Sequence, residues 1–321
     1  MTIDALRACT ARGPLVLDGA MATFVHASAG GASLVAPTDA LTWSQPATIR
    51  AVHDAYLDAG ADIVRTNTFR AASRAHAAGA RDLCLAAARL ARAAADAWSL
   101  RTPPRQRLVA GAIGPADPES EPGRDRHATA ERLRQVFRAP LIGLLEGGVD
   151  LLLFETWWSP SQTEGALRAF VDACDAAGRR VPVLVSTALA PDGRVAASGV
   201  SLAEWLDAVD PATVDGVGVN CGAGPGGLAA PLAALGSRSW LVSCAPSAGG
   251  SSAAGADALD PGPFAQAAAA YATAGLVHIA GGCCGTTPAH IRALAAAIAP
   301  TGADAIAAPN AVATPRRAGT Q

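Results

Sequence analysis

The chain has 321 residues, 50% of them hydrophobic, so it is long enough to bury a large core as one domain or two. Its formal net charge of −2 excludes the basic surface with which proteins bind nucleic acids or anionic membranes. Its sequence contains arginine but no lysine, which excludes mechanisms that need a Schiff-base or Walker-type lysine.

The N-terminus has no basic segment followed by a long apolar core, so we expect no signal peptide. No run of about 18 uninterrupted apolar residues is present, so we expect no membrane span. The seven cysteines are odd in number and scattered along the chain. Without a secretory signal, metal binding or catalysis is a better expectation for them than a disulfide framework, and we expect a cytoplasmic protein.

Along the chain, short apolar runs typical of β-strands alternate with stretches rich in alanine and leucine that are typical of helices. The expected strands are Pro14–Leu17, Asp62–Arg65, Leu108–Ala112, Asp150–Phe154, Val181–Ser186, Gly216–Val219, Trp240–Ser243 and Leu276–Ile279. The expected helices are Ala47–Ala59, Ala80–Ala97, Thr129–Glu146, Gln162–Ala177, Leu202–Val209, Gly227–Leu235, Pro263–Ala274 and Pro288–Ala299. This alternation predicts an α/β protein, a (β/α)₈ barrel of the TIM type in one domain over residues 1–300.

A doubly wound open sheet is the competing fold. It is disfavoured because no Gly-x-Gly-x-x-Gly motif opens a helix after the first strand. Three segments lie outside the alternation. We expect residues 25–42 to form a loop long enough to cover the barrel mouth, and the polar residues 116–128 to form a second loop there. Residues 301–321 have little to pack and are expected to be disordered.

Polar and sulfur-containing residues follow the expected strands. The carboxyl ends of parallel strands share one rim of a barrel, where barrel enzymes place their active sites. Cys221 ends the sixth strand, and the adjacent Cys283 and Cys284 follow the eighth. Three thiolates can hold one Zn²⁺ at about 2.3 Å and leave a fourth tetrahedral position open, as in catalytic zinc sites. The alternative is that these cysteines are small buried hydrophobic residues.

These residues resemble the homocysteine S-methyltransferase family. The matching elements, in chain order, are Asp18–Met21, Trp43–Ser44, Ala59–Asp62, Thr66–Phe69, Phe154–Thr156, Val219–Cys221 and Gly281–Pro288. The resemblance covers about residues 14–298, and its most specific part is Asn-Cys followed at this separation by Gly-Gly-Cys-Cys-Gly-Thr. It implies a zinc-dependent barrel that moves a methyl group to the sulfur of homocysteine and so makes methionine.

The resemblance also implies roles for residues near the metal. Glu155 would hold the ammonium group of homocysteine, Asp18 would lie near the same substrate, and Asn67 and Thr68 would support it from the rim. Each has a simpler alternative. Glu155 could form a salt bridge at the rim, Asp18 could form a turn before the following glycine, and the other two could form rim hydrogen bonds.

The implied partners are small molecules, homocysteine and a methyl donor, with Zn²⁺ as the cofactor. The length of 321 residues leaves no room for the cobalamin and folate domains of folate-dependent relatives, and betaine-using relatives tend to be longer. We therefore expect a sulfonium donor, with S-methylmethionine ahead of S-adenosylmethionine.

Two positions depart from the family pattern. Phe24 stands where the family often has glutamate or glutamine, and Ser247 stands where it commonly has asparagine. These departures leave open another thiol or selenol acceptor, such as selenocysteine. A non-enzymatic zinc or redox module, and a barrel subunit that serves a separate corrinoid protein, are further alternatives.

The remaining candidates have mostly structural interpretations. Cys244 ends the seventh strand and is expected to pack in the core, although a thiol there could also oxidise or replace a ligand. Cys9, Cys84 and Cys174 fall on helical stretches and are expected to be structural. His53 and His290 are expected to be helix caps or surface groups. Trp157 and Trp158 could wall the donor pocket or pack their loop. The positions of these eight residues are read from the sequence.

Overall fold

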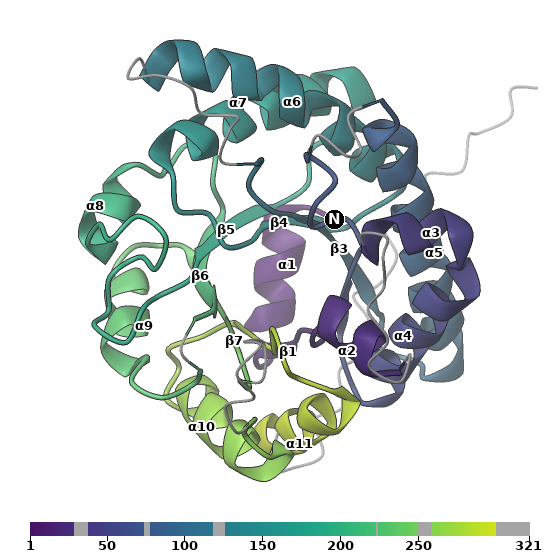
Figure 1. Ribbon diagram of the computed structural model, residues 1–321. Coiled ribbons are helices and arrows are strands. Elements are labelled where there is room, and N and C mark those ends of the chain that lie inside the picture. Colours follow the sequence, from purple (N-terminus) through teal and green to yellow (C-terminus); the bar gives the residue numbers. More distant parts are fainter. Residues whose placement is uncertain (29–37, 74–77, 118–125, 223, 250–257, 300–321) are drawn as a thin grey trace, which may run out of the picture.

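Eight parallel strands surrounded by helices make up the protein (Figure 1). The computed structural model describes residues 1–28, 38–73, 78–117, 126–222, 224–249 and 258–299. The strands are β1 (Leu15–Val16), β2 (Ile63–Arg65), β3 (Leu108–Ile113), β4 (Leu151–Phe154), β5 (Val183–Thr187), β6 (Gly216–Cys221), β7 (Leu241–Pro246) and β8 (Ile279–Ala280). Each expected strand overlaps one of them.

The helices lie outside the strands and are named in chain order. They are α1 (Ile3–Thr10), α2 (Ala22–Ser28), the 3₁₀ helix η1 (Thr38–Ala40), α3 (Leu41–Ser44), α4 (Pro46–Asp58), α5 (Ala80–Arg101), α6 (Arg126–Glu146), α7 (Pro160–Ala177), α8 (Leu202–Asp207), α9 (Ala229–Leu235), α10 (Pro261–Thr273) and α11 (Pro288–Ile298). Within the described residues, no helix is long and apolar enough to cross a membrane.

Neighbouring strands pair in parallel in chain order from β2 to β8, and β8 pairs with β1. A parallel bridge between Leu17 and Ile63 then joins β1 to β2 and closes the ring. The prediction of a (β/α)₈ barrel is therefore confirmed, and the open doubly wound sheet is excluded.

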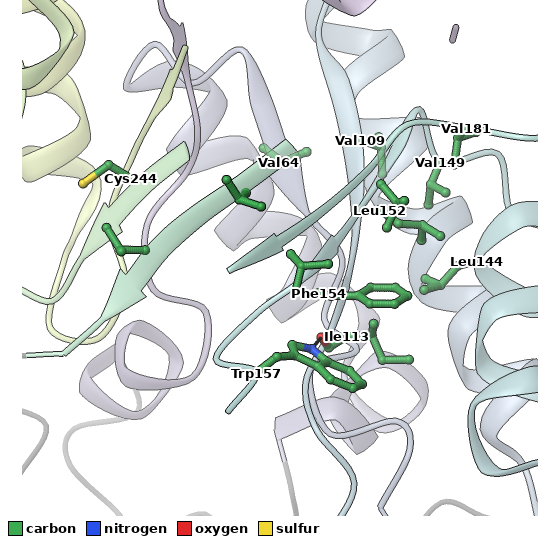
Figure 2. Packing of buried hydrophobic residues seen from close by; sticks show 14 of the residues in the cluster. Val64, Val109, Ile113, Leu144, Val149, Leu152, Phe154, Trp157, Val181 and Cys244 are labelled. Atoms are coloured by element: carbon green, nitrogen blue, oxygen red, sulfur yellow. Dashed lines mark hydrogen bonds between the residues drawn. The ribbon is translucent and has the colours of Figure 1, made fainter. Parts of the chain in front are cut away.

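The strands are apolar on both faces because both faces are buried. Side chains that point into the barrel form one hydrophobic cluster, and those that point outward pack against the helices in a second, larger one. Figure 2 shows part of the outer cluster, where Phe154 lies beside Trp157 with their ring centroids 5.3 Å apart.

Helix α1 covers the end of the barrel at which the strands begin (Figure 1). Its Leu6 is fully buried and belongs to the interior cluster of the barrel. Thr2 caps the N-terminus of this helix, because its hydroxyl accepts a hydrogen bond from the Ala5 amide. This end of the barrel is thus closed, and the opposite end remains for ligands.

The prediction of a loop over residues 25–42 is wrong at both ends of this range. Helix α2 occupies the first part of it, and η1 with α3 occupies the last part. Buried Val25 and Leu41 explain the difference, because each anchors its short helix to the core. Residues 29–37 between these helices lie outside the described residues, as do 118–125 of the second expected loop and the tail 301–321.

His53 corrects another expectation. It is neither a cap nor a surface group, since it is fully buried in α4 and neither ring nitrogen has a hydrogen-bond partner among the described residues. His290 is a capping residue as expected, because its Nδ1 accepts a hydrogen bond from the Thr287 amide at the start of α11.

The cysteines outside the predicted metal site do not join it. Cys244 is buried in the outer cluster, on the face of β7 that packs against helices. Cys9, Cys84 and Cys174 lie on α1, α5 and α7 as expected. None of these four lies with the cluster formed by the other three cysteines.

Candidate metal centre

Cys221, Cys283 and Cys284 meet at the carboxyl end of the barrel, as the sequence predicts. Their sulfur atoms all lie within 4.8 Å of one another, and Sγ of Cys221 is 3.7 Å from Sγ of Cys284. Tetrahedral Zn²⁺ with Zn–S bonds of about 2.3 Å requires its sulfur ligands to be about 3.8 Å apart. The donor type and the spacing therefore fit a three-thiolate zinc site.

The last residue of β7 and the residue that follows it support both parts of this cysteine cluster. The Cys283 amide donates to the Pro246 carbonyl at 2.9 Å, and the Ser247 amide donates to the Cys221 carbonyl at 3.2 Å. The Ser247 hydroxyl also donates to the Cys284 carbonyl at 2.9 Å. Ser247, one of the two departures from the family pattern, thus acts on the backbone of the cluster.

The backbone at Cys221 is in the left-handed region, with φ of 58°, and Thr156 has φ of 64°. Residues other than glycine rarely adopt this backbone conformation, and such strain concentrates at functional sites. The Asn220 side chain links the two places. Its Oδ1 accepts from the Thr156 amide at 2.9 Å, and its Nδ2 donates to the Thr156 hydroxyl at 2.7 Å. This link keeps the ends of β4 and β6 together.

Glycine is required directly after the cysteine pair. Gly285 has φ of 78°, and a Cβ there would collide with the Gly249 carbonyl oxygen. Only glycine can occupy this position without moving the backbone, so the Cys-Cys-Gly order is a condition of the local fold.

A thiolate at one of the three cysteines opposes ionisation of the other two. Hydrogen bonds from the neighbouring cysteines lower the pKa of Cys221 to about 3. The thiolate formed there raises the pKa of Cys283 and of Cys284. A soft divalent cation reverses this repulsion, so the chemistry of the donor set also favours a metal.

A cavity of about 340 Å³ opens beside the cysteine cluster. Cys221, Cys283 and Cys284 form part of its wall, and Glu155 and Asn67 form other parts. Thiolates, a carboxylate and apolar surface therefore face one space that can take a small ligand.

Two of the predicted substrate residues belong to a buried charged triad. Arg65, the last residue of β2, donates from Nε to Oδ1 of Asp18 and from Nη1 to Oε1 of Glu155, both at 2.7 Å. Glu155 lines the cavity, whereas Asp18 is not among the lining residues. Glu155 thus forms the rim salt bridge that was its simpler alternative, and it also faces the ligand space.

Burial raises the pKa values of the two acids in the triad. It raises the pKa of Asp18 to about 6, although the Arg65 guanidinium opposes the rise. It also raises the pKa of Glu155, again against Arg65. The two carboxylates in turn raise the pKa of Arg65, which stays a cation.

Sequence reasoning missed Arg65. The available signal was a charged residue at the end of a strand that is otherwise apolar, directly before Thr66 and Asn67. A buried arginine is rare unless it is paired, so its position at the rim indicated a nearby acid.

Asn67 and Thr68 line the cavity, but the Asn67 amide nitrogen and the Thr68 hydroxyl already have protein partners. Asn67 donates from Nδ2 to the Thr38 carbonyl at 2.8 Å, and the Thr68 hydroxyl donates to the Ala112 carbonyl at 2.6 Å. Both residues therefore make the rim hydrogen bonds that were their simpler alternative.

Neither departure from the family pattern lines the cavity. Phe24 packs against Tyr56, with ring centroids 5.7 Å apart, and Ser247 lies behind the cysteines. Trp157 is fully buried and donates from its indole nitrogen to the Ile113 carbonyl, so it packs its loop. Trp158 is half-buried against the outer cluster.

Comparison with known proteins adds to this geometry. A family model described as homocysteine S-methyltransferase matches residues 15–298. The chain belongs to this family. The resemblance seen in the sequence is thereby confirmed over the whole barrel.

Methionine synthases are among the curated relatives of this homocysteine S-methyltransferase family member. The chain is 34% identical to that of Mycobacterium tuberculosis over 298 residues, which is 89% of the chain and 24% of the relative. It is 34% identical to that of Mycobacterium leprae over 268 residues, 81% of the chain and 22% of the relative. The chain thus spans about a quarter of the length of these relatives.

Solved structures of the homocysteine methyltransferase MmuM from Escherichia coli match the fold more completely. The metallated form has a TM-score of 0.70 and 29% identity and covers 91% of this chain and 99% of its own. The oxidised form has a TM-score of 0.72 and 28% identity with the same coverage. A metal is therefore documented in a protein of similar fold and length.

Proposed function

We propose that this protein transfers a methyl group from a sulfonium donor to the sulfur of L-homocysteine and so produces methionine. The observation that carries the proposal is the meeting of three cysteine sulfurs at a cavity that also presents the buried carboxylate of Glu155. Membership of the homocysteine S-methyltransferase family supports it.

Cys221, Cys283 and Cys284 would hold the metal, which we propose to be zinc. When bound, Zn²⁺ lowers the pKa of a thiol ligand, so that homocysteine binds as a thiolate at neutral pH. Three cysteine thiolates already exceed the charge of the ion, and this excess keeps the substrate sulfur nucleophilic.

Glu155 would bind the ammonium group of homocysteine, because its carboxylate lines the same cavity as the sulfur cluster. Asp18 would act through Arg65, since its carboxylate is bonded to the guanidinium and lies outside the cavity wall. We propose that Asn67 and Thr68 mainly shape the wall, because the Asn67 amide nitrogen and the Thr68 hydroxyl already donate to protein carbonyls.

The charge of the cavity favours a cationic donor. Glu155 and Asp39 add carboxylates to the thiolate cluster, and Arg65 and Arg70 offset only part of this negative charge. A sulfonium ion is attracted to such a site, whereas an anionic donor is repelled. Between the two sulfonium donors, we propose S-methylmethionine ahead of S-adenosylmethionine.

The transfer is an in-line displacement. The homocysteine sulfur forms a bond to the methyl carbon while the bond from that carbon to the donor sulfur breaks, and the electron pair stays with the donor as a neutral thioether. The thiol proton leaves to solvent when homocysteine binds. The residues of the cavity align the two sulfurs and exclude water, which removes much of the entropic barrier.

A donor panel tests this proposal. Zinc-loaded protein under reducing conditions is incubated with homocysteine and S-methylmethionine, S-adenosylmethionine, betaine or a methylated corrinoid protein, and methionine is measured by mass spectrometry. We expect methionine with the sulfonium donors and none with metal-stripped protein. Product with the corrinoid protein alone, or product with no donor at all, would overturn the proposal.

The acceptor is tested in the same assay with selenocysteine and cysteine in place of homocysteine. Phe24 and Ser247 motivated these alternatives, but neither lines the cavity. We therefore expect homocysteine to be methylated with the highest kcat/KM.

A further inference from the structure

Arg65 connects three strand ends that lie far apart in the sequence. It ends β2, and its side chain is buried at the barrel mouth between the residues that follow β1, β4 and β8. Its partners on these three segments are Asp18, Glu155 and Gly282. Among the described residues, no other arginine has hydrogen bonds that join Glu155 to the segment that carries Cys283 and Cys284.

The contacts use nearly the whole guanidinium group. Nε and Nη1 each donate to a carboxylate, as described above. Nη2 donates to three carbonyl oxygens, those of Asp18 at 2.9 Å, Gly19 at 2.8 Å and Gly282 at 2.6 Å. Only the planar fork of arginine reaches acceptors in this arrangement, because a lysine ammonium is a point donor on a flexible stem.

One consequence concerns Glu155. Its Oε1 is taken by Arg65, while its Oε2 makes no hydrogen bond to any described residue, and the side chain lines the cavity. Arg65 therefore fixes the direction of this carboxylate and leaves one oxygen for a ligand. It also balances the buried charges of Glu155 and Asp18, which would otherwise repel each other.

The second consequence concerns the cysteine cluster. Gly282 directly precedes Cys283, and its carbonyl is held by Arg65 while its amide donates to the Asp18 carbonyl at 3.1 Å. Both hydrogen-bonding groups of this glycine are thereby fixed. The direction in which the chain enters the cysteine pair thus depends on the same guanidinium that orients Glu155.

We propose that Arg65 is a positioning residue that sets the geometry between the ammonium end and the sulfur end of the acceptor site, and so makes the site selective for thiols that carry an α-amino group. This inference rests on the proposed function for its substrate. It assigns Arg65 no contact with the reacting atoms.

The test compares Arg65→Lys and Arg65→Met with a matched control, Arg107→Met. Arg107 is also buried and donates to a backbone carbonyl, that of Ala61, but it lies at the opposite end of the barrel. Two acceptors are used, homocysteine and 4-mercaptobutanoate, which lacks the ammonium group. Zinc release to a chromogenic chelator is followed in parallel.

We expect the ratio of kcat/KM for homocysteine to that for 4-mercaptobutanoate to fall about tenfold or more in both Arg65 variants, mainly through the KM of homocysteine. Zinc should leave both variants faster than it leaves the wild type. Arg107→Met should lower thermal stability and change neither the ratio nor zinc release. Arg65→Lys retains the positive charge and keeps the test decisive if Arg65→Met does not fold.

A double-mutant cycle with Glu155→Gln completes the test. Because Arg65→Met already releases Glu155, adding Glu155→Gln should lower the acceptor ratio by less than about twofold more. Additive losses, an unchanged ratio in Arg65→Lys, or an equal change in Arg107→Met would overturn the proposal.

Failure of the proposed function would be visible separately, as a wild type that methylates neither acceptor. In that case the rate of zinc release alone tests whether Arg65 positions the cysteine segment. If zinc leaves the Arg65 variants faster than it leaves Arg107→Met, Arg65 positions the segment that carries Cys283 and Cys284. Equal rates of zinc release would contradict this role.

Discussion

The two ends of the barrel are built from the same strands but differ in kind. At the end where the strands begin, α1 closes the interior with apolar side chains such as Leu6, and Arg105 pairs with Asp62 at 2.6 Å at the edge. At the other end the structure holds three cysteines, a buried charged triad and left-handed backbone at Cys221. Buried charge occurs at both ends, since Arg107 and Asp62 are buried at the closed end, but the mouth combines it with left-handed backbone at Thr156 and Cys221 and with the cysteine cluster.

This contrast teaches where function should be sensitive. Strain and buried charge lower stability unless they are compensated, and they persist at sites where chemistry needs them. Substitutions at the closed end should change the free energy of unfolding and leave the reaction alone. Substitutions at the mouth should change metal binding or the kinetics first.

The largest effect is expected for the three cysteines that we propose as metal ligands. Cys221→Ala and Cys283→Ala should each lose the bound zinc, about one ion per chain in the wild type, and methyl transfer should fall to background. Metal content is measured by inductively coupled plasma mass spectrometry. Cys244→Ala is the control, because this buried cysteine faces the helices and should leave zinc in place. Full zinc in both ligand variants would disprove the site.

At the closed end, Leu6→Ala should destabilise the protein by about 2–5 kcal/mol, because it leaves a cavity under the barrel interior. Chemical denaturation measures the loss. At temperatures where the variant is folded, its zinc content and the KM of homocysteine should equal those of the wild type. A changed KM would contradict the separation of the two ends.

Glu155→Ala should raise the KM of homocysteine about 10- to 100-fold, because the ammonium group loses a charged hydrogen-bond partner. Zinc should remain bound, since Glu155 is not among the clustered sulfur ligands. Steady-state kinetics on variants of known metal content provide the check. An unchanged KM would remove Glu155 from the acceptor site.

The smallest effect concerns His53, which is buried in α4 and does not line the cavity. Burial lowers its pKa to about 4, while the nearby charges of Asp54 and Arg50 act in opposite directions. The folded protein therefore prefers neutral His53, and this contribution to stability is complete above pH about 6.5 and lost as pH falls toward 4.

His53→Leu should accordingly raise the melting temperature slightly at pH 7.5, by an amount corresponding to about 1 kcal/mol, since it removes two buried nitrogens that have no partner among the described residues. The gain over the wild type should grow at pH 5. Thermal denaturation at the two pH values measures it, and equal gains at both would show that His53 does not titrate as described.

Much of this account could be predicted from the sequence. Alternating strand and helix patterns predict the barrel. Because parallel strands end at one rim, the sequence also predicts that Cys221 lies close to Cys283 and Cys284. These inferences depend on periodicity and topology, which are local or repeated properties of the chain.

The missing parts depend on distances between segments. Arg65 pairs with Asp18 and Glu155 only because three strand ends meet, and no local pattern states where a long side chain will point. The sequence predicts a helix cap or a surface group at His53, because a lone polar residue on a helix is mostly exposed. The helices α2 and α3 were missed because buried Val25 and Leu41, rather than local propensity, fix these short segments.

The central claim is that the substrate sulfur joins three cysteine sulfurs on one metal ion. X-ray absorption at the zinc edge, before and after selenohomocysteine is added, tests it most directly. We predict three sulfur neighbours at about 2.3 Å in the free enzyme, and a new selenium neighbour once the ligand binds. A zinc shell that stays free of selenium at saturating ligand would contradict the claim.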